Sequence, residues 1–312
     1  MAVLGKAADI MKPRARSRFP VDRRLTVRMV ITMVLLGLLY ALFGAVLLVL
    51  LGSWLPVVVI LALVILAQYW FSDRIALYAM RGVVLTPEQE PRLHAILDRL
   101  CAQADMPKPA LAVSYAELPN AFATGRNPSH SVVCVTTGLT RRLADDEIEA
   151  VLAHELSHVA HRDVVVITIA SFVAVLAGLL MRASFYGALV GGRGRQGAAL
   201  GAALTAVAMF SAIVYGLGFI LIRALSRYRE LAADRSGAIL TGQPSSLAHA
   251  LVKLDAAGAG IPTEDLRRAA AFNAFLITPA GRRGGSLLST HPDLRTRLDR
   301  LAQLAAALER HG

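Results

Sequence analysis

Four long apolar runs limit what this chain can fold into. They cover residues 27–51, 55–71, 164–181 and 198–222, and their only charged residue is Arg28, at the edge of the first run. About 20 apolar residues in a helix cross the hydrocarbon core of a bilayer. Hydrophobic residues make up 55% of the chain, and the mean hydropathy is +0.54. We therefore expect a mainly α-helical integral membrane protein with four transmembrane helices in two hairpins.

Charges beside these runs predict how the chain is oriented. Residues 1–26 are rich in lysine and arginine, whereas the turn at 52–56 is uncharged. Lysine and arginine stay on the cytoplasmic side, so we expect both termini and the polar segments in the cytoplasm. The basic tail predicts a retained anchor that contacts anionic lipids in the inner (plasma) membrane. Arginines in the loop at 182–197 leave open a second hairpin that is buried in protein and never crosses.

Composition excludes some other classes of protein. The net charge is +11, but the basic residues gather beside the apolar runs and aromatic residues are only 6% of the chain. Nucleic-acid binding is therefore not expected. Cys101 and Cys134 lie far apart and form no CxxC motif, so neither a disulfide framework nor a cysteine metal site is predicted.

Hydropathy also predicts the domain organisation. The segments are a basic tail, a first membrane hairpin, the first half of a soluble domain, a second membrane hairpin and the second half of that domain, at residues 1–26, 27–72, 73–163, 164–222 and 223–312.

The first soluble segment combines helices with a small sheet. A helix capped by Thr86 is predicted over 86–106, and β-branched runs at 110–115 and 131–137 predict strands. The turn-rich stretch between these runs predicts a short antiparallel sheet with an accessible edge near 120–124. Acidic residues open the helix that follows, at 143–163.

The second soluble segment is predicted to be helical. We expect a new helix after Arg223, a break at 242–244, a further helix to residue 258 and an amphipathic helix over 293–312.

The motif HELSH places two histidines four residues apart on the helix over 143–163. His154 and His158 therefore share one face, where both imidazoles can bind one zinc ion. Glu155 is one position further round, where a carboxylate can take a proton from water that the metal has made more acidic. The alternative is a pair of surface histidines on an amphipathic helix.

A catalytic zinc with two histidines needs a third protein ligand and an open position. Glu230 is the best candidate, because the second hairpin returns the chain to the membrane face from which it left after His158. Asp234, four residues later, could accept a hydrogen bond from a ligating histidine. Such a pair of acids can also be a solvated helix face.

Four motifs together resemble one protein family. "NAFATG" at 120–125, "HELSHVAHRD" at 154–163, "RELAAD" at 229–234 and "STHPDLRTRL" at 289–298 occur in the order found in the HtpX family of membrane-bound zinc metalloproteases. The CAAX prenyl proteases are more distantly similar. The resemblance implies a zincin-like (gluzincin) α+β catalytic domain with one Zn²⁺ per chain.

The same resemblance implies roles for named residues. His154, His158 and Glu230 would bind the zinc, Glu155 would be the general base and Asp234 would orient a ligand. His291 would lie near the scissile carbonyl and stabilise an oxyanion, although it could equally cap the last helix with Thr290. An edge strand would bind extended substrate through Asn120, Ala121, Phe122, Ala123 and Thr124.

The expected function is that of a membrane zinc metalloendopeptidase in proteolytic quality control. Its substrates would be polypeptides, chiefly misfolded or damaged membrane proteins, and its surroundings the lipid bilayer. One alternative is a CAAX-type protease of prenylated peptides, which needs a larger membrane chamber than four spans provide. A transporter or scaffold is less favoured, because the interiors of the runs carry no charges and no site residue is missing. A structural zinc site would need a fourth protein ligand, and no cysteine is adjacent to supply one.

Overall fold

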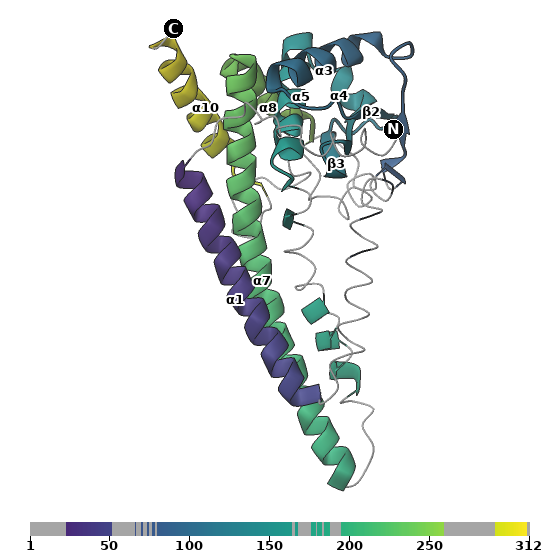
Figure 1. The fold of residues 1–312 in the computed structure, drawn as a ribbon, viewed down its shortest axis with the longest axis vertical. Coiled ribbons are helices and arrows are strands. Elements are labelled where there is room, and N and C mark those ends of the chain that lie inside the picture. The colour runs from purple at the N-terminus through teal and green to yellow at the C-terminus, as the bar shows by residue number, and fades with distance from the viewer. Residues whose placement is uncertain are drawn as a thin grey trace, which may run out of the picture.

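A computed structural model describes residues 23–51, 81–163, 195–258 and 291–310, with shorter stretches and single residues between 66 and 80 and between 166 and 187. It has a head of helices and strands on a long helical stalk (Figure 1). Residues 1–22 of the predicted tail over 1–26 lie outside the described residues, as do residues 259–290 and most of the apolar runs at 55–71 and 164–181.

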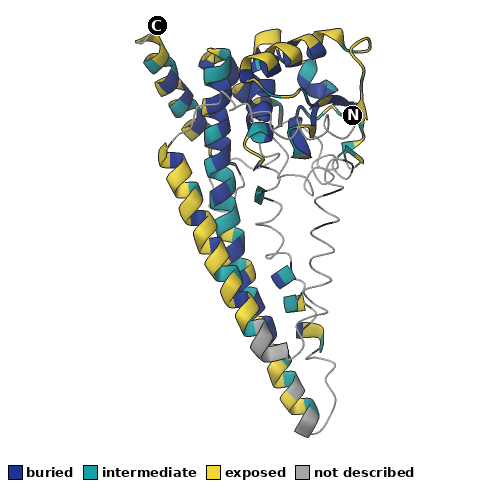
Figure 2. Cartoon of the chain, in the orientation of Figure 1, coloured by how far each residue is buried: buried dark blue, intermediate teal, exposed yellow. Residues whose placement is uncertain are grey.

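The stalk contains two antiparallel helices, α1 (Arg23–Leu51) and α7 (Arg195–Thr241) (Figure 1). Phe43 of α1 meets Phe210 of α7 with ring centroids 6.0 Å apart. Nearer the head, the Arg28 guanidinium lies 5.9 Å from the centre of the Tyr228 ring. Within the described residues, these two helices are long and apolar enough to cross a membrane, where the sequence predicted four spans. The outer face of α1 is exposed over residues 23–46 (Figure 2).

One prediction about α7 is wrong. A new helix was expected after Arg223, but α7 continues without a break from the fourth apolar run through Glu230. The stretch over 223–229 contains neither glycine nor proline, so nothing in it ends a helix. The helix ends at Thr241, before Gly242 with its φ of +68°, and α8 (Pro244–Gly258) follows. The predicted break at 242–244 is confirmed.

The sheet has four strands, β1 (Gly82–Val84), β2 (Ala110–Ser114), β3 (Ala121–Asn127) and β4 (His130–Thr136), in the order β1-β2-β4-β3. It is mixed, so the prediction of an antiparallel sheet is wrong: β2 and β4 are parallel. The cause is topological, because the β3–β4 hairpin inserts β4 between β2 and β3. β3 therefore lies at an edge, as predicted for residues 120–124.

In the head, α5 (Asp145–Ala160) packs on one face of the sheet, and α3 (Pro91–Ala104) and α8 contact α5. α10 (Leu294–Glu309) packs on α7 and α8, and the short α4 (Thr137–Thr140) follows β4. α3 begins at Pro91 and not after Thr86, because proline fits the first turn of a helix, where its missing N–H costs nothing.

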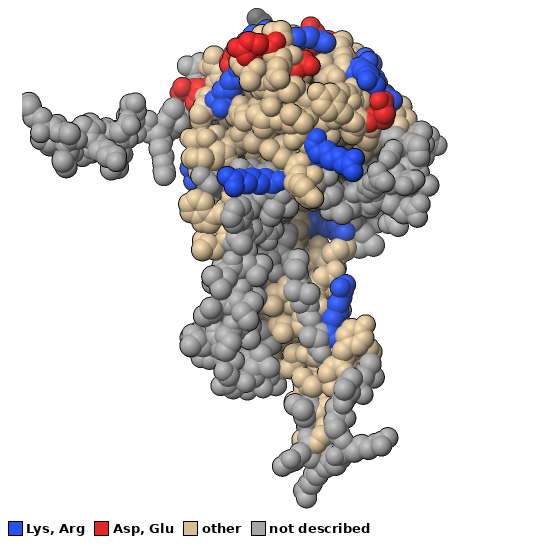
Figure 3. All heavy atoms as spheres, turned by 90° about the vertical axis from the view of Figure 1, so that its right-hand side faces the viewer, with Lys and Arg blue, Asp and Glu red and all other residues tan. Residues whose placement is uncertain are grey.

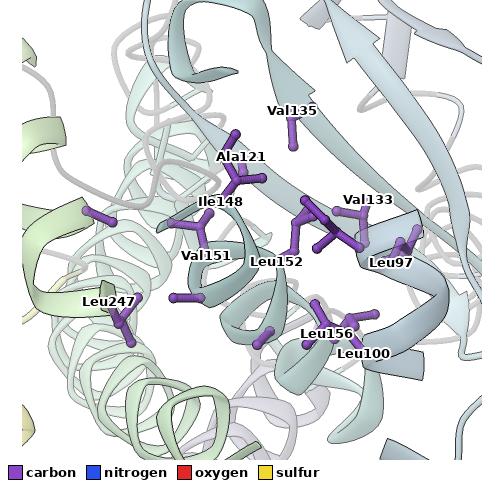
Figure 4. Close-up of a cluster of buried hydrophobic side chains, with 14 of the residues drawn as sticks. Leu97, Leu100, Ala121, Val133, Val135, Ile148, Val151, Leu152, Leu156 and Leu247 are labelled. Atoms are coloured by element: carbon purple, nitrogen blue, oxygen red, sulfur yellow. The ribbon is translucent and has the colours of Figure 1, made fainter. Parts of the chain in front are cut away.

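The core of the head lies between this sheet face and α5. Val133 and Val135 project from β4 toward Leu152 and Leu156 of α5, and Leu97 of α3 closes one side (Figure 4). All five side chains are fully buried. Each contributes about 1.5–3 kcal/mol by leaving water, which fixes α5 firmly against the sheet.

Candidate active site

Helix α5 carries the HELSH motif into the interior of the head. Its first turn contains Asp145, Asp146 and Glu147, and the Glu147 carboxylate accepts a hydrogen bond of 2.8 Å from the Ala144 amide. Negative charge at this end stabilises the helix dipole. Both candidate histidines therefore project from a helix that is largely buried.

Two histidines and one glutamate converge where α5 meets α7. The Nε2 atoms of His154 and His158 are 3.2 Å apart. The Glu230 carboxylate oxygens lie 3.7 Å from the first Nε2 and 3.4 Å from the second. Ligand atoms of all three residues lie within 4.8 Å of one another, close enough to bind one metal ion. The structure thus brings together the three residues that the sequence predicted as ligands.

The surroundings of the two imidazoles fit a bound cation. Nδ1 of His154 is 3.0 Å from an oxygen of Asp234, and Nδ1 of His158 is 2.6 Å from an oxygen of Asp163. Because carboxylates only accept hydrogen bonds, each Nδ1 carries the proton and each Nε2 presents a lone pair. Two lone pairs and the Glu230 carboxylate then face one another with no proton between them. A His₂Glu set of this kind suits zinc.

Each of these two carboxylates is also bound by a buried arginine. Arg297 of α10 donates two hydrogen bonds to Asp234, at 2.7 and 2.6 Å, and Arg229 of α7 approaches Asp163 at 2.9 Å. Burial opposes the charge of Arg297, but its pKa is raised because Asp234 outweighs that cost. Asp234 contacts His154 as predicted from the sequence.

Sequence reasoning missed Arg229, Arg297 and the role of Asp163. One signal for Arg297 was present: it lies on the same helix face as Leu294, Leu301 and Leu304. A charged residue on the apolar face of an amphipathic helix requires a buried partner.

Glu155 lies beside the cluster. It is only 4% exposed, and the amide of Ala123 in β3 donates a hydrogen bond to its carboxylate. Burial raises the pKa of Glu155 above its usual range, and the neighbouring Glu230 adds to the rise, against the opposing effects of His154, His158 and the Ala123 amide. A carboxylate with a raised pKa is suited to accept and return a proton near neutral pH.

His291 lies close to a proposed ligand. Its Nδ1 is 3.1 Å from Glu230 Oε2, and the residue is 4% exposed. The residue at the N-cap of α10 is Asp293, which does not favour the capping alternative for His291. An oxyanion role for His291 stays a prediction.

The backbone of β3 presents groups on its outer side that no further strand of the described sheet pairs. The Thr136 amide donates to the Asn120 carbonyl at 2.9 Å, so this pair faces inward, toward β4. Bonding alternates along an antiparallel pair, so Phe122 and Thr124 also face β4, whereas Ala121 and Ala123 turn their amides and carbonyls outward. The hydrogen bond from Ala123 to Glu155 agrees with this register. The side chains from Asn120 to Thr124 are all buried.

Comparison with known proteins gives close relatives. The chain is 61% identical to Protease HtpX homolog 1 of Streptomyces coelicolor over 94% of this chain and 97% of that protein. It is 49% identical to the Protease HtpX homolog of Moorella thermoacetica, over 92% and 97% of the two chains. These relatives confirm the predicted resemblance to the HtpX family and, with the two apolar helices, support membrane association.

A solved structure shares the fold. The crystal structure of S. mikatae Ste24p matches with a TM-score of 0.53 at 18% identity, over 90% of this chain and 67% of that one. Residues 87–305 match peptidase family M48, whose metalloproteases are zinc-dependent in general. This match spans most of the chain and includes every residue of the cluster described above, so the chain belongs to peptidase family M48 and is a metalloprotease.

Proposed function

We propose that this metalloprotease is a zinc endopeptidase that cleaves polypeptides at the cytoplasmic face of a membrane. The observation that carries the proposal is the convergence of His154, His158 and Glu230 beside Glu155 and the open edge of β3. One Zn²⁺ per chain would be held by the two Nε2 atoms and the Glu230 carboxylate. Bound there, it would polarise the scissile carbonyl and make water more acidic.

The proton transfers are assigned to Glu155. Its carboxylate takes a proton from the attacking water and then delivers that proton to the leaving amine. The amide of Ala123 keeps the carboxylate directed toward the cluster, because it donates to it from a strand that the core fixes in place.

The substrate is proposed to bind as an additional strand. The outward amide and carbonyl of Ala121 and the outward carbonyl of Ala123 would pair with an extended peptide, while Asn120, Phe122 and Thr124 hold the strand against β4. Pairing through the backbone does not depend on the side chains of the peptide. Such an edge suits a protease that accepts many different unfolded segments.

The membrane sets the proposed substrates. Helix α7 runs from the stalk into the head and itself carries Glu230, so the site lies close to the end of the stalk (Figure 1). Misfolded or damaged membrane proteins would present unfolded segments close to the membrane surface, where the site is proposed to lie. We also propose the membrane topology that the sequence predicts. Residues 27–72 and 164–222 form two membrane hairpins, and both halves of the catalytic domain and both termini lie in the cytoplasm.

The test uses full-length protein purified in detergent and supplied with zinc. Cleavage of casein and of the chain itself is measured for wild type and Glu155→Gln, with Glu149→Gln on the same helix as the matched control. We expect Glu155→Gln to bind zinc normally and to lose about 10²–10⁴-fold in activity, the usual contribution of a general base. Full activity in a zinc-loaded Glu155→Gln protein would remove Glu155 from this role.

A further inference from the structure

We propose that Asp163 and Arg229 form a clamp that positions His158 for metal binding. The inference rests on the proposed metal site and concerns residues that neither bind the metal nor contact substrate. Asp163 would fix the imidazole, and Arg229 would act through Asp163.

The local backbone directs Asp163 back toward the histidine. Helix α5 ends at Ala160, and Arg162 then adopts a φ of +56°, which turns the chain sharply. This turn places Asp163 Oδ2 at 2.6 Å from His158 Nδ1, the short distance of a charge-assisted hydrogen bond. Asp163 is 6% exposed, so water competes little for its carboxylate.

The second oxygen of Asp163 is bound from another helix. Arg229 Nη2 of α7 lies 2.9 Å from Oδ1. Arg229 is 4% exposed, and its Nε and Nη1 have no hydrogen-bond partner among the residues that the structure describes. Burying an arginine with one such contact costs free energy, so it is poorly explained as a stabilising ion pair. Its position against Asp163 points to a role in orientation.

The clamp also connects distant parts of the chain. Asp163 immediately precedes the third apolar run, and Arg229 follows the fourth and is adjacent to Glu230. The contact therefore fixes the distance between the end of the histidine helix and the turn of α7 that carries the third ligand. His154 is held in a similar way, by Asp234 with Arg297, so each ligating histidine has its own carboxylate and arginine.

Zinc affinity of the detergent-purified full chain, measured by competition with a chelator, tests the clamp. Loss of a group that orients a ligand typically weakens metal binding 10–100-fold, and we expect this of Asp163→Asn and Arg229→Gln. Arg235→Gln, an exposed arginine on the same helix, should bind zinc like wild type. The absorption spectrum of bound Co²⁺ should change in Arg229→Gln but not in Arg235→Gln, because it reports the geometry of the ligands.

A double variant separates a clamp from two independent structural effects. If Arg229 acts through Asp163, Arg229→Gln should cost little further affinity in an Asp163→Asn background. Arg229→Lys keeps the positive charge and should recover part of the lost zinc affinity. If Arg229→Gln does not fold, zinc affinity is measured instead for Arg229→Lys and Asp163→Asn, singly and combined. The clamp would be overturned if Arg229→Gln bound zinc with wild-type affinity, or if the fold-losses of the two single variants multiplied in full in the double variant. Either result would leave the proposed function standing. A wild-type protein that binds no zinc would overturn the proposed function together with the clamp.

Discussion

The two ends of α7 bury opposite kinds of side chain. In the stalk, this helix packs Val207 and Val214 toward its neighbours and exposes Met209 and Ile213, which are 65% and 58% exposed. In the head, the same helix buries charged and polar residues, namely Arg229, Glu230, Asp234 and Ser236. Charge in the head is thus sheltered from solvent, whereas apolar surface in the stalk is exposed to it.

This difference shows how one helix serves two surroundings. A buried charge is tolerated only with a partner, and α7 finds partners on α5, on α10 and at Asp163, three residues after α5 ends. An exposed apolar face of this length is tolerated when lipid replaces water. On the face that Figure 3 shows, acidic residues of the described part of the chain appear only on the head, whereas basic residues appear on both the head and the stalk.

The largest effect is expected at the head end, from Glu230→Ala. Structural zinc sites with four ligands bind with about 10–16 kcal/mol, or on the order of 3 kcal/mol per ligand. Loss of Glu230 should therefore weaken zinc binding at least about 100-fold. Zinc content after dialysis against a moderate chelator measures this, with Arg235→Ala on the same helix as the control. Equal zinc content in both variants would remove Glu230 from the site.

The next effect is expected in the stalk, from Ile213→Lys. A lysine near the middle of a membrane helix costs about 2.5–3.5 kcal/mol on insertion scales. The matched control is Val252→Lys, because Val252 is 46% exposed on α8 in the head. Fractionation of expressing cells should show Ile213→Lys depleted from the membrane and Val252→Lys unchanged. If both proteins reach the membrane equally well, the stalk end of α7 is not in lipid.

A smaller effect is expected from Gly237→Ala, where α7 crosses α5. A methyl group at Gly237 would lie 2.8 Å from the backbone nitrogen of His154 and 3.0 Å from its Cα. The two helices must separate to admit it, at about 1–3 kcal/mol. We expect a lower midpoint of thermal unfolding in detergent and weaker zinc binding. Gly216→Ala is the control in the stalk, because a methyl group there meets nothing within 4 Å. Equal effects of the two substitutions would contradict the close crossing.

The sequence predicted features that depend on local pattern. β-branched runs identified β2 and β4, Gly242 and Pro244 marked the break after α7, and the histidine spacing placed two proposed ligands on one helix face. Each of these signals involves residues that are neighbours along the chain.

Features that depend on distant partners were not predictable in this way. The direction of β4 beside β2 follows from a hairpin insertion that neither strand encodes. Arg297 reaches Asp234 across 63 positions, and only its place on an apolar helix face suggested a partner. The first residue of α3 was also not predicted, because several starting positions fit the same apolar pattern. The helix begins at Pro91 and not after the capping residue Thr86.

The smallest effect is expected from thiol modification, which tests how well the head excludes solvent. Burial raises the pKa of Cys101 to about 11 and that of Cys134 to about 12. At pH 8 the thiolate that reacts with iodoacetamide is therefore at least about 100-fold scarcer than for an ordinary cysteine. Both cysteines should stay unlabelled in the folded protein and react fully in denaturant, and the treated protein should keep its activity. Arg235→Cys supplies an exposed thiol that should react rapidly in the same sample. Labelling of Cys101 or Cys134 at a comparable rate would mean that the head opens, in which case the buried charges of α7 are not sheltered as the structure has them.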